Sequence, residues 1–419
     1  MRQVQVLSFA RFFLSATGEQ TIFAFASFAG QVFLARHLTQ DQYGLFALAS
    51  TFLAVAASLH VTLWGEPVVV YGKSRFQGLT LGYFRRVFQL QLYFGAALAT
   101  AAFALALLIL RAKEWLYTSL AIALALPSWL TLTFYRRAVY VFPAPHLAAL
   151  GGVLYTGIFL PTLFLLHKCS LLQSDTAFLA VFLGSLGSLL VVRHFKPFCI
   201  RQNMALNKKD IFLLHFSYGR WVIPALALSG LAGNLPYWTL ASAHSIEDVA
   251  RLRVLALLYT PINLIAAALS QLALSSLAPV SVQPRAFVFR LKAATGLAIA
   301  FTAPFSLATV IWGQPALQAL FDNQYASIPP LYLSLLAPIP VLLGIAGMMG
   351  TALRALNRPQ RVLALHLSSS ALVLFLATIL PIKMGLPGAL LSLTLLFLLQ
   401  AISGAYLVIG TIKQIRNGG

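Results

Sequence analysis

Charged residues are scarce in this sequence. They make up 9% of its 419 residues, whereas soluble globular proteins carry about 25%. A chain with so few charges cannot cover a water-exposed surface, so the composition excludes a soluble enzyme and a disordered chain. What it has instead is apolar: 60% of the residues are hydrophobic, and the mean hydropathy is +0.85. The composition therefore predicts a polytopic α-helical membrane protein.

Acidic residues and cysteines are the rarest functional groups. The chain has 9 Asp and Glu against 29 Lys and Arg, which gives a net charge of +20. In a soluble protein this excess would suggest nucleic acid. In a membrane protein, cytoplasmic loops and anionic headgroups account for it, so no nucleic-acid partner is expected. The only cysteines, Cys169 and Cys199, have no metal-ligand spacing and form no disulfide framework.

Catalytic motifs are missing as well. The sequence has no Ser/His/Asp spacing, no Gly-rich phosphate loop and no His/Cys cluster. Membrane glycosyltransferases, ligases and polymerases normally carry their reactive groups on a large extramembrane loop, and the predicted connections here are too short for one. The sequence therefore predicts a transporter and not an enzyme. Without a nucleotide motif, an H⁺ or Na⁺ gradient is the expected driving force, with no cofactor and no metal.

Long apolar runs define the predicted architecture. A spanning helix needs about 20 predominantly apolar residues, and twelve segments meet this requirement. We expect spans near residues 10–35, 43–65, 83–110, 115–135, 146–167, 175–192, 211–238, 249–275, 288–313, 328–352, 362–382 and 386–410.

The distribution of Lys and Arg predicts the orientation of these spans. The two termini and the even-numbered connections hold 21 of them, and the odd-numbered connections hold 7; Arg220, inside a span, completes the 29. Positive charge concentrates in cytoplasmic loops. Both termini are therefore expected in the cytoplasm.

An internal repeat predicts two halves. The connection after the first span and the connection after the seventh align at an offset of 206 residues, which superposes Thr39 on Ser245 and Asp41 on Glu247. Both connections have the side chains of a helix N-cap. The repeat divides the chain into six-helix lobes at 1–205 and 206–419, with the polar stretch 193–210 as a cytoplasmic linker. Because six is even, both lobes share one topology, with a substrate path expected between them.

Several segments resemble a known transporter family. Residues 31–50 (QVFLARHLTQDQYGLFALAS) resemble the start of Wzx-type polysaccharide flippases of the multidrug/oligosaccharidyl-lipid/polysaccharide (MOP) exporter superfamily. Residues 322–356 resemble the tenth span of that family, and Asn357-Arg358-Pro359 and residues 384–392 (MGLPGALLS) resemble its eleventh- and twelfth-span signatures. These are loose hydrophobic patterns that cover almost the whole chain.

The resemblance implies an all-α integral membrane protein of the MATE type. Its twelve helices would form two pseudo-symmetric six-helix bundles in a V shape. It also implies a function in a bacterial inner membrane: moving an undecaprenyl-diphosphate-linked oligosaccharide from the cytoplasmic to the outer leaflet for surface polysaccharide (O-antigen) biosynthesis, by alternating access. Its partners would be this lipid-linked cargo, membrane lipids, and the polysaccharide polymerase or ligase machinery.

Polar residues within the spans are the candidate site. Glu19 lies about ten residues into the first predicted span, roughly 15 Å of helix rise, and is our candidate for ion coupling. A structural ion pair with Arg220 is the alternative. Arg220 and Arg11 are candidates for binding the diphosphate in the cavity, because guanidinium grips phosphate oxygens bidentately. Weaker candidates for polar cavity residues are Glu66, His60 and His215.

Two other functions remain open on the sequence alone. A MATE-like exporter of small molecules or drugs is the first alternative, although an exporter of cationic drugs should concentrate carboxylates in its spans. A membrane scaffold, or a glycan ligase or polymerase, is the second.

Overall fold

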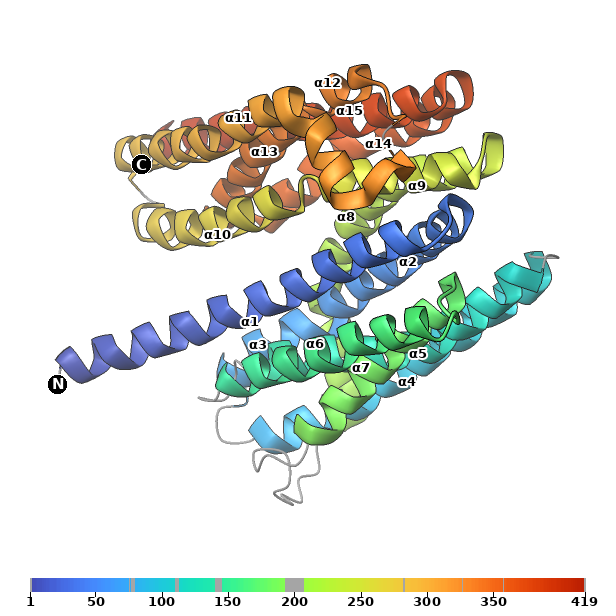
Figure 1. The fold of residues 1–419 in the computed structure, drawn as a ribbon. Coiled ribbons are helices and arrows are strands. Elements are labelled where there is room, and N and C mark those ends of the chain that lie inside the picture. The colour runs from blue at the N-terminus through green and yellow to red at the C-terminus, as the bar shows by residue number, and fades with distance from the viewer. Residues whose placement is uncertain are drawn as a thin grey trace. The chain divides into compact units, whose positions relative to one another are not determined.

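The structure is a computed structural model that consists of long helices (Figure 1). It describes residues 2–74, 76, 80–109, 113–139, 145–192, 207–281, 283–325, 327–356 and 358–417. No strand occurs among these residues. Helix is the conformation that satisfies every backbone N–H and C=O within one apolar segment, which explains why so apolar a chain adopts it throughout.

The chain forms two compact units, residues 1–223 and 224–419. The first unit contains α1 (Arg2–His37), α2 (Gln40–His60), η1 (Val61–Gly65), α3 (Glu66–Ser74), α4 (Thr80–Ile109), α5 (Lys113–Ala138), α6 (Pro145–Lys168), α7 (Ser174–Val192) and the beginning of α8 (Lys208–Ala243). The second contains the rest of α8, α9 (Ile246–Leu257), α10 (Thr260–Leu277), η4 (Ala278–Val280), α11 (Pro284–Phe321), η5 (Asp322–Tyr325), α12 (Pro330–Leu336), α13 (Pro338–Ala355), α14 (Pro359–Met384) and α15 (Leu386–Asn417).

The helices match the twelve predicted spans. Within the described residues, nine helices are long and apolar enough to cross a membrane, and the pair α9–α10, bent by 51°, makes a tenth. The other two predicted spans fall on α1 and α8, which have 36 residues each and include side chains outside the described set. The twelve-helix prediction is confirmed.

The internal repeat recurs in the helix boundaries. α1 begins at Arg2 and α8 begins at Lys208, and the offset of 206 that relates these starts also relates their ends, His37 and Ala243. The next helix of each unit has the predicted N-cap. Thr39 Oγ1 accepts from the Gln42 N–H at 3.3 Å, and Ser245 Oγ accepts from the Asp248 N–H at 3.1 Å.

The division between the units lies inside a helix. It falls between Ile223 and Pro224 in the middle of α8, not at residue 205. Residues 193–206 of the predicted linker lie outside the described residues, and Lys208 already belongs to α8. The reason is packing: Ile211 belongs to a buried apolar cluster of the first unit, and His215 hydrogen-bonds to residues of that unit.

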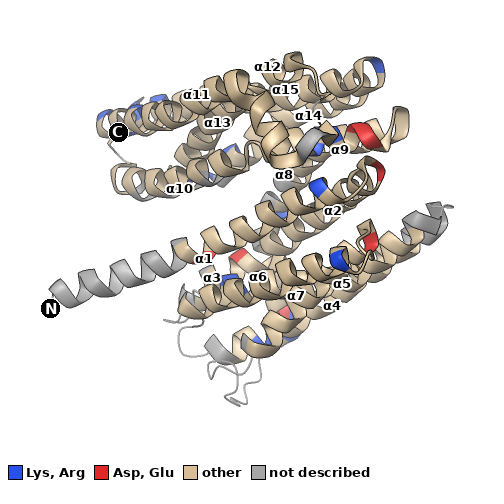
Figure 2. Ribbon diagram, viewed as in Figure 1, with Lys and Arg blue, Asp and Glu red and all other residues tan. Residues whose placement is uncertain are grey.

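The outer surface of both units is apolar. Large side chains such as Phe25, Phe289, Trp312, Phe375 and Tyr406 are exposed. Exposed aromatic rings on long apolar helices are what a lipid-facing surface requires, because the hydrocarbon solvates them better than water does. The charged residues are few, and long stretches of helix have neither acidic nor basic colour in Figure 2.

Candidate functional site

The buried carboxylate of the first unit is Glu19, and it is ion-paired. Its side chain, on α1, is 2% exposed and accepts from the guanidinium of Arg136, in the last turn of α5. The same guanidinium lies over the Phe23 ring at 3.3 Å from the centroid, and Phe23 stacks on Tyr155 at 5.2 Å. The ring face and the carboxylate together solvate a cation that has been withdrawn from water.

The depth of this pair differs from the expected one. Because α1 begins at Arg2, Glu19 lies in its middle, and about 27 Å of helix rise separates Glu19 from His37 at the far end. That distance is close to the whole hydrocarbon thickness of a bilayer, about 30 Å. Arg136, likewise, stands two residues before the end of α5. Glu19 therefore lies near one end of the bundle and not at its midplane.

The neighbouring cation, Arg137, contacts the helix defect next to α2. A Cβ on Gly65 would lie 2.9 Å from Arg137 Cδ, so any larger residue would force the Arg137 side chain to shift. Gly65 is the last residue of the π-helical turn η1. Such turns widen the helix and leave carbonyls displaced from the regular ladder, and they are frequent at functional sites. The end of α5 thus contacts both α1 and η1.

His215, on α8, contacts the π-helical turn η1. Its Nδ1 lies 2.9 Å from the Leu63 carbonyl oxygen of η1, and its Nε2 lies 2.6 Å from the Tyr83 hydroxyl of α4. A carbonyl can only accept, so Nδ1 carries the proton, and in the neutral ring the Tyr83 hydroxyl donates to Nε2. Trp64 packs against the ring at 5.4 Å between centroids. His215 is 0% exposed, so it offers no surface to a cargo in this conformation.

His60 forms a second buried polar chain across three helices. Its Nε2 donates to Gln91 Oε1 at 3.0 Å, and Gln91 Nε2 donates to Thr131 Oγ1 at 3.4 Å. His60 and Gln91 are both 0% exposed, and His60 Nδ1 has no hydrogen-bond partner among the described residues. Polar pairs of this kind hold transmembrane helices together. The geometry is that of a contact between helices.

The remaining predicted residues lie on α3, α8 and α1. Glu66 is half-buried as the first residue of α3. Arg220 is exposed on α8, beside the buried Gly219 and one turn before Pro224. Pro224 has no N–H to continue the helical ladder, which loosens α8 at this turn. The Arg11 side chain lies outside the described residues. No group of three His, Cys, Asp or Glu among the described residues is placed to hold a metal.

Sequence reasoning missed the partner of Glu19. Arg136 was counted only as a loop charge that sets orientation, because a basic pair at the end of a span has the pattern of a topology signal. Tyr83 and Gln91 were missed too, since a lone polar residue in an apolar run does not reveal its partner. Arg220 was the alternative partner considered for Glu19 from the sequence; the structure places the guanidinium of Arg136 against the carboxylate.

Comparison with solved structures identifies the architecture. The chain is similar to an inward-facing multidrug resistance MATE transporter of the MOP superfamily (TM-score 0.73, 14% identity, 96% of this chain and 99% of that one). It is also similar to the Vibrio cholerae MATE transporter VcmN (TM-score 0.68, 14% identity, 100% and 99%). The fold is that of the MATE transporters.

A third MATE-like neighbour differs in its pocket. It is a MOP superfamily transporter from Pyrococcus furiosus (TM-score 0.68, 14% identity, 98% of this chain and 96% of that one), with a binding pocket of reverse polarity that suggests a different function. No protein-family model and no curated protein matches the sequence. The MATE fold is therefore established by structure, while the Wzx-type subfamily is not.

Proposed function

We propose that the chain is a secondary transporter of the MATE fold that moves its cargo across a membrane by alternating access. The observation that supports this is the similarity to MATE transporters over nearly the full length of both chains. Short connections and the scarcity of charge agree with it, because they leave no room for a soluble catalytic or scaffolding domain. A coupling ion, H⁺ or Na⁺, is the proposed energy source.

For the cargo, the comparisons favour export of a small molecule over the flippase expected from the sequence. Multidrug transport is the function that the solved neighbours carry in their names. The positions of the acidic residues restrict the charge that this cargo can carry. Glu19, which lies in the interior of α1, is bound to Arg136. The other acidic residues lie at helix ends, in connections, or after the turn η1. A cationic drug would have to compete with Arg136 for Glu19, so we propose an anionic or neutral molecule.

The second candidate is the lipid-linked oligosaccharide flippase. A specific observation favours it: Arg220 is exposed on an apolar helix, next to Gly219 and before Pro224, in a chain of net charge +20. An Arg at membrane depth costs about 2.5–3.5 kcal/mol on insertion scales. Binding the diphosphate of a polyprenyl carrier would give this charge a function, with Arg11 as a second ligand. The Pyrococcus furiosus neighbour supports the idea that this fold can adopt a pocket of the opposite polarity.

Deletion of the gene, followed by complementation, separates the two candidates. If the chain flips lipid-linked glycan, the deleted strain accumulates diphosphate-linked glycan on the cytoplasmic leaflet and loses surface polysaccharide. If it exports a small molecule, surface polysaccharide stays normal and the strain retains organic anions or neutral drugs that the complemented strain expels. Reconstituted protein that transports neither class under an ion gradient would contradict the transporter proposal itself.

A further inference from the structure

One end of the second unit is basic without any balancing carboxylate. The segments 276–292, 353–361 and 413–419 contain no Asp or Glu. The hydrogen bonds of Arg361 to Leu407 and Gln414 place the start of α14 beside the end of α15 at this end. The charges here are Arg285, Arg290, Lys292, Arg354, Arg358, Arg361, Lys413 and Arg416.

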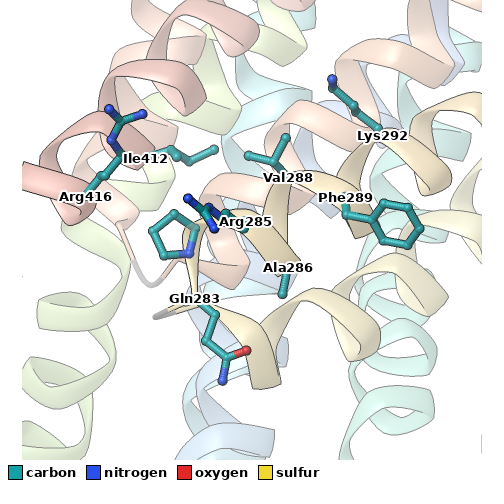
Figure 3. A pocket seen from close by; sticks show the side chains of 9 residues that line it. Gln283, Arg285, Ala286, Val288, Phe289, Lys292, Ile412 and Arg416 are labelled. Carbon is teal, nitrogen blue, oxygen red and sulfur yellow. The ribbon is translucent and has the colours of Figure 1, made fainter.

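Three of these cations line one cavity. It has a volume of about 950 Å³ and lies where α11 begins and α15 ends, with Arg285 and Lys292 from α11 and Arg416 from α15 around it (Figure 3). Gln283 adds an amide to the lining, and no carboxylate belongs to it.

The side chains of the three lining cations have no partner within the part of the chain that the structure describes. None of Arg285, Lys292 and Arg416 makes a side-chain hydrogen bond or an ion pair there. Arg290, by contrast, donates to the Ser276 carbonyl at 2.7 Å, and Arg361 binds side chains and a carbonyl of α15. Like charges that converge on one cavity repel each other, and an anion placed there would relieve this repulsion.

The apolar part of the lining indicates what kind of anion fits. Phe289, 75% exposed, adjoins the cations on α11, and Val288 and Ile412 also belong to the lining. An aromatic ring left exposed beside cations, at the end of membrane-spanning helices, is the arrangement at a lipid–water interface. A small soluble anion would use the cations and leave this apolar surface uncovered.

We propose that the cavity binds the phosphate headgroup of an anionic membrane phospholipid, with its acyl chains along Phe289. The Arg side chains contact the phosphate oxygens, and Lys292 adds a point charge. Under the orientation predicted from the sequence, this end faces the cytoplasm, where anionic headgroups attract basic pockets between helices. The site is distinct from Arg220 and does not depend on which cargo is transported.

The test measures retention of lipid by the full-length protein purified in a neutral detergent. Native mass spectrometry would count bound phosphatidylglycerol, with phosphatidylcholine as the zwitterionic comparison. The triple variant Arg285→Ala/Lys292→Ala/Arg416→Ala should bind phosphatidylglycerol at least about tenfold more weakly. The matched control Arg290→Ala/Arg358→Ala/Lys413→Ala removes the same charge from the same end and should change binding less than about twofold.

Three results would overturn the proposal. Normal phosphatidylglycerol binding by the triple variant would exclude the cavity. An equal loss in the control would mean that diffuse charge and not a site attracts the lipid. Displacement of phosphatidylglycerol by millimolar inorganic phosphate would assign the cavity to a free anion. The single variants Arg285→Gln and Arg416→Gln are the control for misfolding of the triple variant, and each should have a normal melting curve. Each should weaken phosphatidylglycerol binding in part.

Discussion

Glu19 on α1 and Arg136 on α5 form a buried ion pair that joins two helices far apart in the sequence. The carboxylate is 2% exposed and the arginine 19% exposed. Removing one partner of such a pair leaves a charge in the interior without compensation, and this typically costs about 3–5 kcal/mol. Loss of either partner alone should therefore weaken the packing of α1 in the first unit.

The first prediction follows from this cost. Glu19→Gln and Arg136→Gln should each lower the melting temperature of the detergent-purified protein clearly, and the double variant should recover part of the loss, because it leaves no unpaired charge. Tryptophan fluorescence during heating measures this. The matched control is Glu247→Gln, which removes an exposed carboxylate and should change stability by less than about 1 kcal/mol. Additive effects of the two single variants would show that the residues do not interact.

The second prediction concerns ion coupling. A proton that binds Glu19 removes the charge that holds the Arg136 guanidinium, and this breaks the ion pair between α1 and α5. Glu19→Gln would mimic this neutral state permanently. We expect this variant to lose transport driven by a pH gradient while keeping cargo exchange without a gradient. Proteoliposomes with an imposed gradient measure the first activity, and counterflow measures the second. If Glu19→Gln keeps unaltered transport driven by a gradient, the Glu19–Arg136 pair has only a structural role.

The third prediction tests the orientation. In a background with Cys169 and Cys199 replaced by Ser, a cysteine at Gln40 should react with a membrane-impermeant maleimide added outside intact cells. A cysteine at Lys413, exposed near the end of α15, should react only after the membrane is opened. The physical basis is the excess of Lys and Arg on the side of the termini. The reverse pattern of labelling would invert the topology.

The fourth prediction concerns the contact between His215 and Tyr83. Tyr83→Phe removes the donor to Nε2 and leaves a buried acceptor unsatisfied, which costs about 1–3 kcal/mol. We expect a lower melting temperature, and a larger effect for His215→Ala because the Leu63 carbonyl of η1 then loses its donor too. Tyr406→Phe is the control, since Tyr406 is 78% exposed and should have no effect. Equal stability of Tyr83→Phe and wild type would contradict the hydrogen bond.

The sequence predicted local features well and long-range partners poorly. The caps at Thr39 and Ser245 were predictable, because a cap depends on residues three positions apart. The spans were predictable, because apolar length alone selects them. The pairing of Glu19 with Arg136 was not, since it joins residues 117 apart through the packing of α1 and α5. The turn η1 was not predictable either: its signals are Gly65 and a carbonyl bonded by His215, and both gain meaning only in the fold.

The last prediction concerns Arg220 and decides between the proposed cargoes. If Arg220 binds a diphosphate, its planar, permanently charged guanidinium is needed, and lysine can replace the charge but not the bidentate geometry. Arg220→Lys should then retain part of the flipping of lipid-linked glycan, and Arg220→Ala should abolish it, with both variants inserted and folded normally. The readout is glycan delivered to the outer leaflet in the complemented deletion strain.

Arg137→Lys is not a suitable control, because Arg137 packs against Gly65. Lys413→Ala is a suitable control, since it removes an exposed charge near the end of α15. Normal flipping by Arg220→Ala would exclude this residue as a diphosphate ligand. If the wild-type chain itself delivers no glycan in this strain, export of a small molecule becomes the better supported function.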